Sequence, residues 1–387
     1  MATLTRVRIE PAVEGRANRP DYVLLSAVVA LSGFGLLMIY SATRYVLERS
    51  DLPPSFSMER QMVFVTIGLI AMLLLSRVDY REYRNYLPII YGVTLLLLVV
   101  VFAFPPVNGA RRWIPLPLFQ FQPAEFAKLV VIVAAAQVLA SNEEGTRLPW
   151  ATLLRSGVLV GVPFVLIFLE PDLGTTMVLP FVWAAMLFAA GAGWRQLGSL
   201  FVLGVVGTFT VFRLGVLKGH QMDRIRVFLD PSIDPQGIGY QLRQSKLAIG
   251  SGQLFGKGLF QGTQTNLSYV PEQETDFIFT AVGEQLGLVG GLLVLAAFLV
   301  IVWRLMVIAV SARDRFGSLI AVGIAALIMF HTFVNIGMTM GIAPVTGLPL
   351  PFLSQGGSFY VAMAMGIGIA NSIWLRRSPV PGVVRSG

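Results

Sequence analysis

The 387-residue sequence contains no cysteine and only two histidines, His220 and His331. Without cysteine the chain can form no disulfide framework, thiolate nucleophile or Cys-based metal site, and two histidines are too few for a His-rich zinc site. Charge is also scarce, because charged residues make up 13% of the chain where soluble domains have about 25%. Since this shortage runs along the whole chain and hydrophobic residues reach 55%, the composition is typical of a protein that crosses a membrane many times.

The net charge of +8 does not indicate a nucleic-acid partner, because the chain has no basic segment with interleaved aromatic residues. In a membrane protein such an excess is typical of cytoplasmic loops held at an anionic leaflet. The first apolar run, from Tyr22 to Ala42, has no clear cleavage site and is longer than the core of a signal peptide, about 7–15 residues. We therefore expect it to be an uncleaved first span.

Apolar runs of the length needed to cross a bilayer, about 20 residues, recur along the chain. The predicted spans are 22–43, 60–76, 86–104, 123–140, 152–169, 173–191, 197–216, 276–302, 317–340 and 356–375. The sequence thus predicts an all-α polytopic membrane protein with ten transmembrane helices. They form one membrane domain, 21–377, between the tails 1–20 and 378–387.

The distribution of arginine predicts the orientation of these spans. An even number of spans puts both termini on one side, and most arginines lie in the segments on that side. Counted with the mouths of their spans, the short loops of the opposite side hold few cations. These are Arg44, Arg49, Arg60, Arg111 and Arg112. The bias predicts that both termini are cytoplasmic, and it places the long loop 217–275, between the seventh and eighth spans, outside the cytoplasm.

Polar residues or irregular backbone stand out at four places in or beside the apolar spans, and the first two are the start of the fourth span and the turn after the fifth. Glu125 and Lys128 open the fourth span and lie three residues apart, so they share a helix face and can neutralise each other. A charge deep in a bilayer costs about 2.5–3.5 kcal/mol, so the pair is interpreted as a structural ion pair, as the polar wall of a substrate cavity, or as both, since the two roles are compatible. Asp172 follows the fifth span in a tight turn and is interpreted as the N-cap of the sixth helix.

Three acids, Glu272, Glu274 and Asp276, gather at the outer start of the eighth span. Asp276 is followed by Phe277 and further apolar residues, so desolvation should raise its pKa and make it a better base near neutral pH. The alternative is that Asp276 is a helix N-cap. Glu284, deeper in the same span, is interpreted as a buried, hydrogen-bonded helix residue.

The segment 341–358 combines apolar side chains with Gly and Pro at a density that no helix tolerates. Irregular backbone at membrane depth occurs only where protein or a wet cavity surrounds it, so this segment, with Ser354 and Gln355, is either a re-entrant linker or part of a cavity wall. In the long loop, the pattern from Gln236 to Gly250 predicts a helix with Arg243 and Lys246 on one face. It is either an interfacial helix whose cations could hold a phosphate group or a plain surface helix.

Several of these segments carry motifs of a known family, in the family's order. They are Asn108–Ile114, Gln122–Lys128, Asp234–Ser245, Gly262–Thr265, Pro271–Phe279, Asn335–Met338 and Pro344–Ser358. The chain resembles the shape, elongation, division and sporulation family over nearly all of residues 20–377. Gln355, Ala124 and Glu274 depart from the usual residues of the family, which puts details of cavity polarity in doubt. Pro271–Gln273 and Asn335–Met338 favour the elongation member of the family over the division member.

The resemblance implies a peptidoglycan glycosyltransferase of the bacterial inner membrane that polymerises lipid II, with Asp276 as the general base. It also implies that cations or a divalent ion such as Mg²⁺ or Mn²⁺ stabilise the leaving pyrophosphate. The candidate substrate- and pyrophosphate-binding residues are Arg111, Arg112, Arg243, Lys246 and Glu272, and the cavity-structuring residues are Glu125, Lys128, Ser354 and Gln355. A class B penicillin-binding protein is the implied partner, beside lipid II, the glycan on undecaprenyl pyrophosphate and membrane lipids.

Two functions of other classes remain open at the level of sequence. A lipid II flippase could use the same cavity to carry a headgroup across the membrane, and a noncatalytic scaffold would tolerate substitution of Asp276. A glycosidase is disfavoured, because Glu272, Glu274 and Asp276 lie too close in sequence to act as two opposed carboxylates.

Overall fold

The computed structural model describes residues 19–106, 110–117, 119–142, 147–215, 219–230 and 232–377. Within these ranges the chain is mostly helical, and its only strands form a two-residue antiparallel pair, β1 (Ile114–Pro115) with β2 (Gln120–Phe121). The predicted tails 1–20 and 378–387 lie almost wholly outside the described residues, as does the start of the first family motif, at Asn108.

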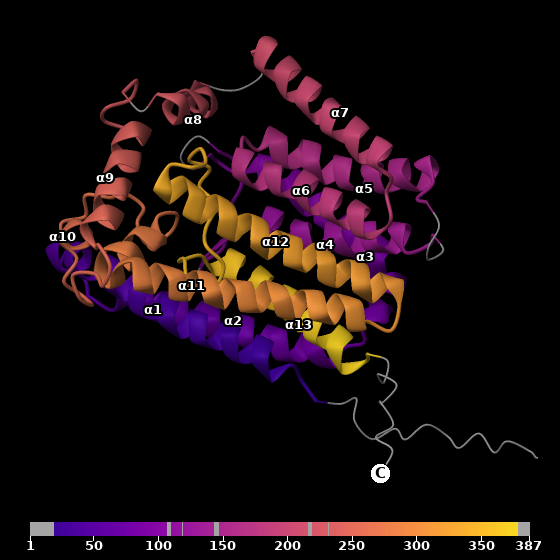
Figure 1. The fold of residues 1–387 in the computed structure, drawn as a ribbon, viewed down its shortest axis with the longest axis horizontal. Coiled ribbons are helices and arrows are strands. Elements are labelled where there is room, and N and C mark those ends of the chain that lie inside the picture. The colour runs from indigo at the N-terminus through magenta and orange to yellow at the C-terminus, as the bar shows by residue number, and fades with distance from the viewer. Residues whose placement is uncertain are drawn as a thin grey trace, which may run out of the picture.

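Each of the ten predicted spans coincides with a long helix. These helices are α1 (Tyr22–Arg49), α2 (Phe56–Arg77), α3 (Tyr83–Val100), α4 (Pro123–Leu139), α5 (Trp150–Leu169), α6 (Leu173–Ala189), α7 (Trp194–Arg213), α11 (Ile278–Ser311), α12 (Arg315–Met340) and α13 (Gly357–Leu375). The 3₁₀ turns η1 (Tyr80–Glu82) and η2 (Val101–Ala103) flank α3. The helices run roughly alongside one another as a bundle (Figure 1).

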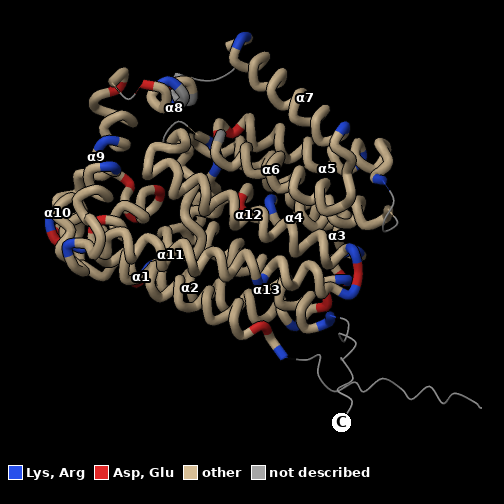
Figure 2. The backbone as a smooth tube through the Cα atoms, in the orientation of Figure 1, with Lys and Arg blue, Asp and Glu red and all other residues tan. Residues whose placement is uncertain are grey.

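Eight helical stretches of the described chain are long and apolar enough to cross a membrane. Of the ten helices, α4 and α6 are not among these eight, because both are short. α6 is apolar, whereas α4 carries Glu125 and Lys128 near its start. Charged residues gather mainly at the ends of the helices, while their middle turns are mostly uncharged (Figure 2). The chain is therefore a mostly helical, multi-span membrane protein.

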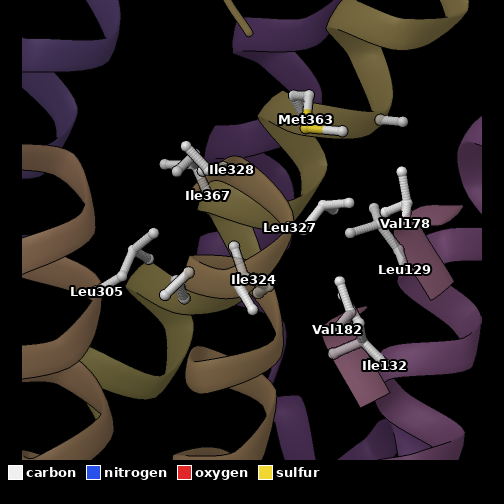
Figure 3. Packing of buried hydrophobic residues seen from close by; sticks show 14 of the residues in the cluster. Leu129, Ile132, Val178, Val182, Leu305, Ile324, Leu327, Ile328, Met363 and Ile367 are labelled. Atoms are coloured by element: carbon white, nitrogen blue, oxygen red, sulfur yellow. The ribbon is translucent and has the colours of Figure 1, made fainter. Parts of the chain in front are cut away.

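The centre of the bundle is formed by α12 and α13. In their most apolar windows 83% and 78% of the residues are buried, whereas in α7 only 6% are, and α7 lies at the edge of the bundle (Figure 1). A helix that is apolar all round is suited to such a central place. Figure 3 shows how buried side chains fill the space, with Leu129 and Ile132 of α4 near Val178 and Val182 of α6.

Three short helices precede α11 at the end of the bundle opposite the described termini. They are α8 (Gly219–Leu229), α9 (Ile238–Ser251) and α10 (Thr263–Asn266) (Figure 1). The predicted loop helix is thus present as α9. It docks on the end of α12, because Ser245 Oγ donates to the Thr339 carbonyl at 2.6 Å, while Arg243 and Lys246 are exposed.

The helix α11 is interrupted at Gly287, whose φ of +63° and ψ of −158° are not helical. The loop after α9 supplies the partners that the break requires: Leu288 N donates to Gln253 O at 2.9 Å, and Val289 N donates to Leu254 O at 3.1 Å. Buried backbone groups need such partners. The break therefore fixes the loop against α11 and sets the position of the segment that leads into this helix.

At the other end of the bundle, Asp21 joins three helices that are far apart in sequence. Its backbone N–H donates to Asn371 Oδ1 at 2.9 Å, and its carboxylate accepts from Arg304 Nη2 at 2.7 Å. The start of α1 and the ends of α11 and α13 therefore lie together. The first and last described residues lie at this same end of the molecule.

Candidate active site

A cavity of about 540 Å³ opens among the start of α4, the helices α8 and α9, the acidic segment before α11 and the connection from α12 to α13. It lies at the end of the bundle away from the described termini. Its charged lining residues are Arg60, Arg112, Glu125, Asp172, Arg224, Glu272, Glu274 and Asp276. Residues from five of the seven family motifs, all except Gly262–Thr265 and Asn335–Met338, thus line one cavity.

Asp276 is held at this cavity through its backbone. Its carbonyl accepts a 2.8 Å hydrogen bond from Asn335 Nδ2, which also donates to the Leu348 carbonyl at 2.7 Å. Its N–H donates to the carbonyl of Glu272 at 3.1 Å, and Glu272 has a φ of +52°, which is costly for a residue other than glycine. Because the N-cap position of α11 is Phe277, the alternative that Asp276 caps this helix is wrong.

The carboxylate of Asp276 has a close backbone neighbour in Gly347. A Cβ added to Gly347 would lie 3.1 Å from Asp276 Oδ2, and the φ of Gly347 is +75°. The pKa of Asp276 is raised to about 6, mainly because the group is buried. The charge of Arg112 lowers this pKa, and the charge of Glu272 raises it. The expected desolvation of this acid is therefore present, and its pKa suits a base that works near neutral pH.

The acidic segment is also tied to α11 by a chain of buried hydrogen bonds. Gln273 Nε2 donates to Thr280 Oγ1 at 2.8 Å and to Thr265 Oγ1 at 3.2 Å. Thr265 in turn donates through its N–H and hydroxyl to Glu284 Oε2, while Glu284 Oε1 pairs with Lys257 Nζ at 3.1 Å. Glu284 is fully buried, so the interpretation of this acid as a hydrogen-bonded helix residue is confirmed.

The guanidinium groups of Arg60, Arg112 and Arg224 bring positive charge to the cavity. Arg112 Nη1 lies 3.4 Å from Asp172 Oδ2, and its guanidinium carbon lies 4.1 Å from the centre of the Trp113 ring. Arg224, on α8, donates from Nη1 to the Thr346 carbonyl at 2.7 Å. Asp172 also accepts from Thr175 N at 3.1 Å, which confirms its interpretation as the N-cap of α6.

The pair Glu125–Lys128 is buried behind the cavity wall. Lys128 Nζ lies 2.8 Å from Glu125 Oε2 and 3.2 Å from His331 Nε2. Glu125 lines the cavity and Lys128 does not. The pair is therefore both an ion pair and, through Glu125, a part of the polar wall.

Gln355 lines the cavity, and its N–H donates to the Glu274 carbonyl at 2.9 Å. Ser354 lies outside the lining and accepts from Leu350 N at 2.9 Å through its hydroxyl. The side chain of Ser354 thus stabilises the turn that presents Gln355. The segment 341–358 contributes to the cavity wall.

Three predicted phosphate-binding residues lie outside the cavity lining. Arg111 is exposed and donates to the Phe102 carbonyl at 3.1 Å. Arg243 is exposed and donates to the Pro235 carbonyl at 2.8 Å, and Lys246 is exposed beside α12. Of the four predicted cations only Arg112 lines the cavity, and the described structure adds Arg60 and Arg224 to it.

Some polar atoms on the lining residues are buried and have no hydrogen-bond partner within the described ranges. They are Arg112 Nε and Gln355 Oε1. Buried polar atoms nearly always have a partner in folded proteins, so these atoms are available to a bound polar ligand.

The carboxylates do not form a protein-only metal site. No group of three or more acidic or histidine side chains converges within the part of the chain that the structure describes. Mg²⁺ commonly binds through one or two carboxylates together with the phosphates of a substrate. A divalent ion here would thus be held mainly by the phosphates of a ligand.

Sequence reasoning missed Arg224 as a cavity residue. Nothing local distinguishes it from Arg226, two positions further along α8, which is exposed and lies 3.9 Å from Asp223. Asn335 lay within a recognised motif, but its two hydrogen bonds to distant carbonyls could not be inferred from its neighbours.

Known proteins resemble this chain over nearly its whole length. The family model described as cell cycle protein, for FtsW, RodA and SpoVE, matches residues 22–378. A probable peptidoglycan glycosyltransferase FtsW of Trichlorobacter lovleyi is 38% identical over 371 residues, covering 94% of this chain and 95% of that protein. Peptidoglycan glycosyltransferase MrdB of Escherichia coli K12 is 37% identical over 358 residues, covering 92% and 94%.

Solved structures share the fold. Rod shape determining protein RodA of Thermus thermophilus matches with a TM-score of 0.68 and 28% identity, over 93% of this chain and 98% of that chain. A chain in a structure described as the coordination of polymerization and crosslinking by a peptidoglycan synthase complex matches with a TM-score of 0.77 and 29% identity, over 92% and 98%. The resemblance that the sequence motifs indicate is thereby confirmed, and the chain belongs to the shape, elongation, division and sporulation family of FtsW, RodA and SpoVE.

Proposed function

We propose that this chain is a peptidoglycan glycosyltransferase that polymerises lipid II, with Asp276 as the general base. The observation that carries the proposal is the placement of Asp276 in a polar cavity, with its pKa raised to about 6 and with Arg112 and Arg224 lining the same space. The curated relatives named FtsW and MrdB are peptidoglycan glycosyltransferases, which supports the same activity here.

In the proposed reaction the 4-hydroxyl of the acceptor sugar attacks the anomeric carbon of the glycan carried on undecaprenyl pyrophosphate. The new C–O bond forms as the bond from the anomeric carbon to the pyrophosphate oxygen breaks. The hydroxyl proton passes to an Asp276 carboxylate oxygen, and undecaprenyl pyrophosphate leaves with the bonding electron pair. A single displacement inverts the anomeric carbon and needs no covalent enzyme intermediate.

Negative charge that develops on the leaving pyrophosphate requires fixed positive charge in a site sheltered from water. Arg112 and Arg224 are the residues that we propose for this role, since both line the cavity. Arg111, Arg243 and Lys246 lie outside the lining and remain candidates for contacts with the rest of the lipid-linked substrate.

The remaining predicted site residues shape the cavity in this proposal. Glu272 forms the turn that presents Asp276, and Glu125 with Lys128 supplies a polar wall whose charges compensate each other. Gln355 offers a free amide oxygen for a sugar hydroxyl or amide, and Ser354 stabilises its turn. A Mg²⁺ or Mn²⁺ ion would be held mainly by the pyrophosphate, and no step of the proposal is routed through it.

We also propose that all ten helices that match the predicted spans cross the bacterial inner membrane and form one domain, 21–377. These ten include α4 and α6, which are shorter than the others. The excess of arginine at the terminal end puts both termini, and the tails 1–20 and 378–387, in the cytoplasm. The segment 217–275 then lies outside, where the cavity meets the outer leaflet.

The biological role that we propose is cell elongation, as for RodA, rather than division, as for FtsW. The motifs Pro271–Gln273 and Asn335–Met338 favour it, although relatives of both kinds are similarly close. The proposed partner is a class B penicillin-binding protein, because a similar chain occurs in a complex that joins polymerization to crosslinking. Rescue of rod shape in cells depleted of the elongation polymerase would test this role, and rescue of division alone would overturn it.

The activity is tested with purified protein, co-expressed with its class B penicillin-binding protein, supplied with lipid II. Wild type should make long glycan strands, and Asp276→Asn should make none at equal yield and equal thermal stability. Asp223→Asn, which removes an exposed acid on α8, should leave the activity unchanged. Polymer from Asp276→Asn at the wild-type rate would refute Asp276 as the base. If neither wild type nor any variant makes polymer while lipid II still crosses the membrane of reconstituted vesicles, the result would favour a flippase.

A further inference from the structure

A second cavity, also of about 540 Å³, lies at the opposite end of the bundle from the site of Asp276. It opens among the end of α6, the end of α11, the start of α12 and the residues before α5. Its polar lining consists mainly of Arg147, Arg313, Asp314, Arg315 and Ser318. The mechanism proposed above uses none of these residues.

Two of the charged groups in this cavity are already engaged by the protein. Asp314 accepts from Arg81 Nε at 3.2 Å and from the Tyr80 hydroxyl at 3.1 Å. Arg315 donates from Nη1 to the carbonyl of Asn142 at 2.8 Å and from Nη2 to that of Ala190. Arg315 therefore joins α12 to the end of α6, and the acid at the cavity is neutralised by a cation outside it.

The other two cations are not compensated in the same way. Arg147 and Arg313 are exposed, and neither takes part in an ion pair with any residue that the structure describes. The cavity thus has an excess of positive charge, on guanidinium groups whose planar donors match the oxygens of a phosphate.

The surroundings of this cavity are apolar in the way expected at a membrane surface. Val310, on the cavity lining, is 86% exposed, and nearby Phe188 and Trp194 are 62% and 81% exposed. The rings of Phe188 and Trp194 pack with their centroids 6.2 Å apart. Tryptophan is enriched where spanning helices meet the headgroups, so a phosphate that reaches this cavity with an apolar tail would find both of its parts accommodated.

We infer that this cavity is a binding site for the phosphate headgroup of an anionic membrane lipid, with Arg147 and Arg313 as its two phosphate-binding residues. A basic pocket between membrane helices is the type of site that holds such headgroups. Because the cavity lies at the end of the bundle that carries the termini, the lipid belongs to the leaflet on that side. The lipid would connect the ends of α6 and α11 with the start of α12.

The test is native mass spectrometry of the purified full chain titrated with phosphatidylglycerol or with phosphatidylethanolamine of the same acyl chains. Soluble glycerol 3-phosphate is a third ligand and separates a lipid from a free phosphate. Wild type should bind phosphatidylglycerol in preference to the other two. Each arginine near an anionic headgroup contributes about fivefold in affinity, so Arg147→Gln/Arg313→Gln should bind about 25-fold more weakly.

Matched variants separate the site from general charge and from misfolding. Arg77→Gln/Arg155→Gln removes two exposed cations that do not line the cavity, and it should bind like wild type. Arg147→Lys/Arg313→Lys should keep most of the affinity, and thermal stability in detergent should be the same for all variants.

Several results would overturn the inference. They are equal binding of the two lipids, wild-type affinity in the Arg147→Gln/Arg313→Gln variant, an equal loss in the control pair, or preference for soluble glycerol 3-phosphate. Glu143 and Glu144 lie outside the described residues, so Glu143→Gln/Glu144→Gln is titrated as well. Binding that appears only in that variant would mean that acids of the chain fill the cavity, which also overturns the inference. The readout needs no lipid II and is independent of the polymerase activity.

Discussion

At the scale of single residues, the proposed mechanism depends on opposing influences on the carboxyl group of Asp276. Burial disfavours the charged form of Asp276 and raises its pKa, and Arg112 and Arg224 favour the charged form. The balance leaves a pKa of about 6, compared with an ordinary value of 3.8. The group is therefore ionised at neutral pH and is still a stronger base than an exposed aspartate.

The first prediction is a pH profile set by Asp276. Above about pH 6 the carboxylate can accept the hydroxyl proton, so the rate should be level there and should fall about tenfold per unit below it. A carboxyl whose pKa is higher in the folded state stabilises that state at low pH and loses this contribution as the pH rises through about 6. Acid unfolding through this group thus does not explain the loss. Polymerisation rates between pH 4.5 and 8 check the profile, and a rate independent of pH would contradict it.

The second prediction concerns Asn335 as a positioning residue. Its amide holds the Asp276 carbonyl and the Leu348 carbonyl together, so Asn335→Ala should let the base move. Misplacement of about 1 Å can cost about 100-fold in rate, and we expect kcat to fall by about 10- to 100-fold with KM little changed. Asn371→Ala is the control, because that buried asparagine binds Asp21 at the opposite end. It should lose stability and keep its rate per folded molecule. Equal kcat in both variants would contradict the role of Asn335.

At the scale of elements, glycines allow α2 and α13 to pack closely along one seam. A Cβ added to Gly368 would lie 2.6 Å from the Met72 carbonyl oxygen and 2.9 Å from Met72 Cα. Backbone atoms cannot move aside as the end of a side chain can, so the two helices approach only because this position is glycine. The same seam supports the start of α13, which lines the cavity.

The third prediction is that Gly368→Ala destabilises the bundle by about 1–3 kcal/mol, because added atoms in a packed interior force the helices apart. Gly92→Ala is the matched control within α3, where an added Cβ meets nothing within 4 Å. There alanine should stabilise the helix by about 0.5–1 kcal/mol. Thermal unfolding in detergent measures both changes. A Gly368→Ala variant as stable as wild type would show that α2 can shift without cost.

At the scale of the whole molecule, the two ends of the bundle differ in chemistry. One end carries the cavity with Asp276 and the three short helices, and the other carries the described termini and most of the arginines. This division follows from alternating spans whose connections differ in charge. It predicts which residues face each side of the membrane.

The fourth prediction uses the absence of native cysteine, since any introduced thiol is the only one in the chain. Leu254→Cys, on the exposed loop after α9, should react in intact spheroplasts with a thiol reagent that does not cross membranes. Arg313→Cys, at the opposite end, should react only after the membrane is opened. Mass spectrometry of the labelled protein gives both results. The reverse pattern would invert the proposed orientation, and labelling of both sites from outside would reject the span count.

Much of this architecture can be predicted from the sequence, because it depends on local properties. The length of each apolar run predicts a helix, and the excess of arginine on one side of the spans predicts their orientation in the membrane. The spacing of Glu125 and Lys128 brings them together by helix geometry alone. The motifs indicate the family and identify Asp276 as a candidate site residue. The apolar residues that follow Asp276 predict that its pKa is raised.

Only the tertiary structure decided which distant groups meet Asp276. Asn335 is 59 residues away from it, and Arg224 binds the Thr346 carbonyl across 122 residues. Arg243 and Lys246 have the same charge as Arg224, yet packing of α9 on α12 leaves them exposed. Local periodicity determines which face of a helix is apolar, whereas the packing of all helices together determines which polar groups share a cavity. The helices and the choice of Asp276 as the proposed base can thus be predicted from the sequence, whereas the surroundings of Asp276 are decided by the fold.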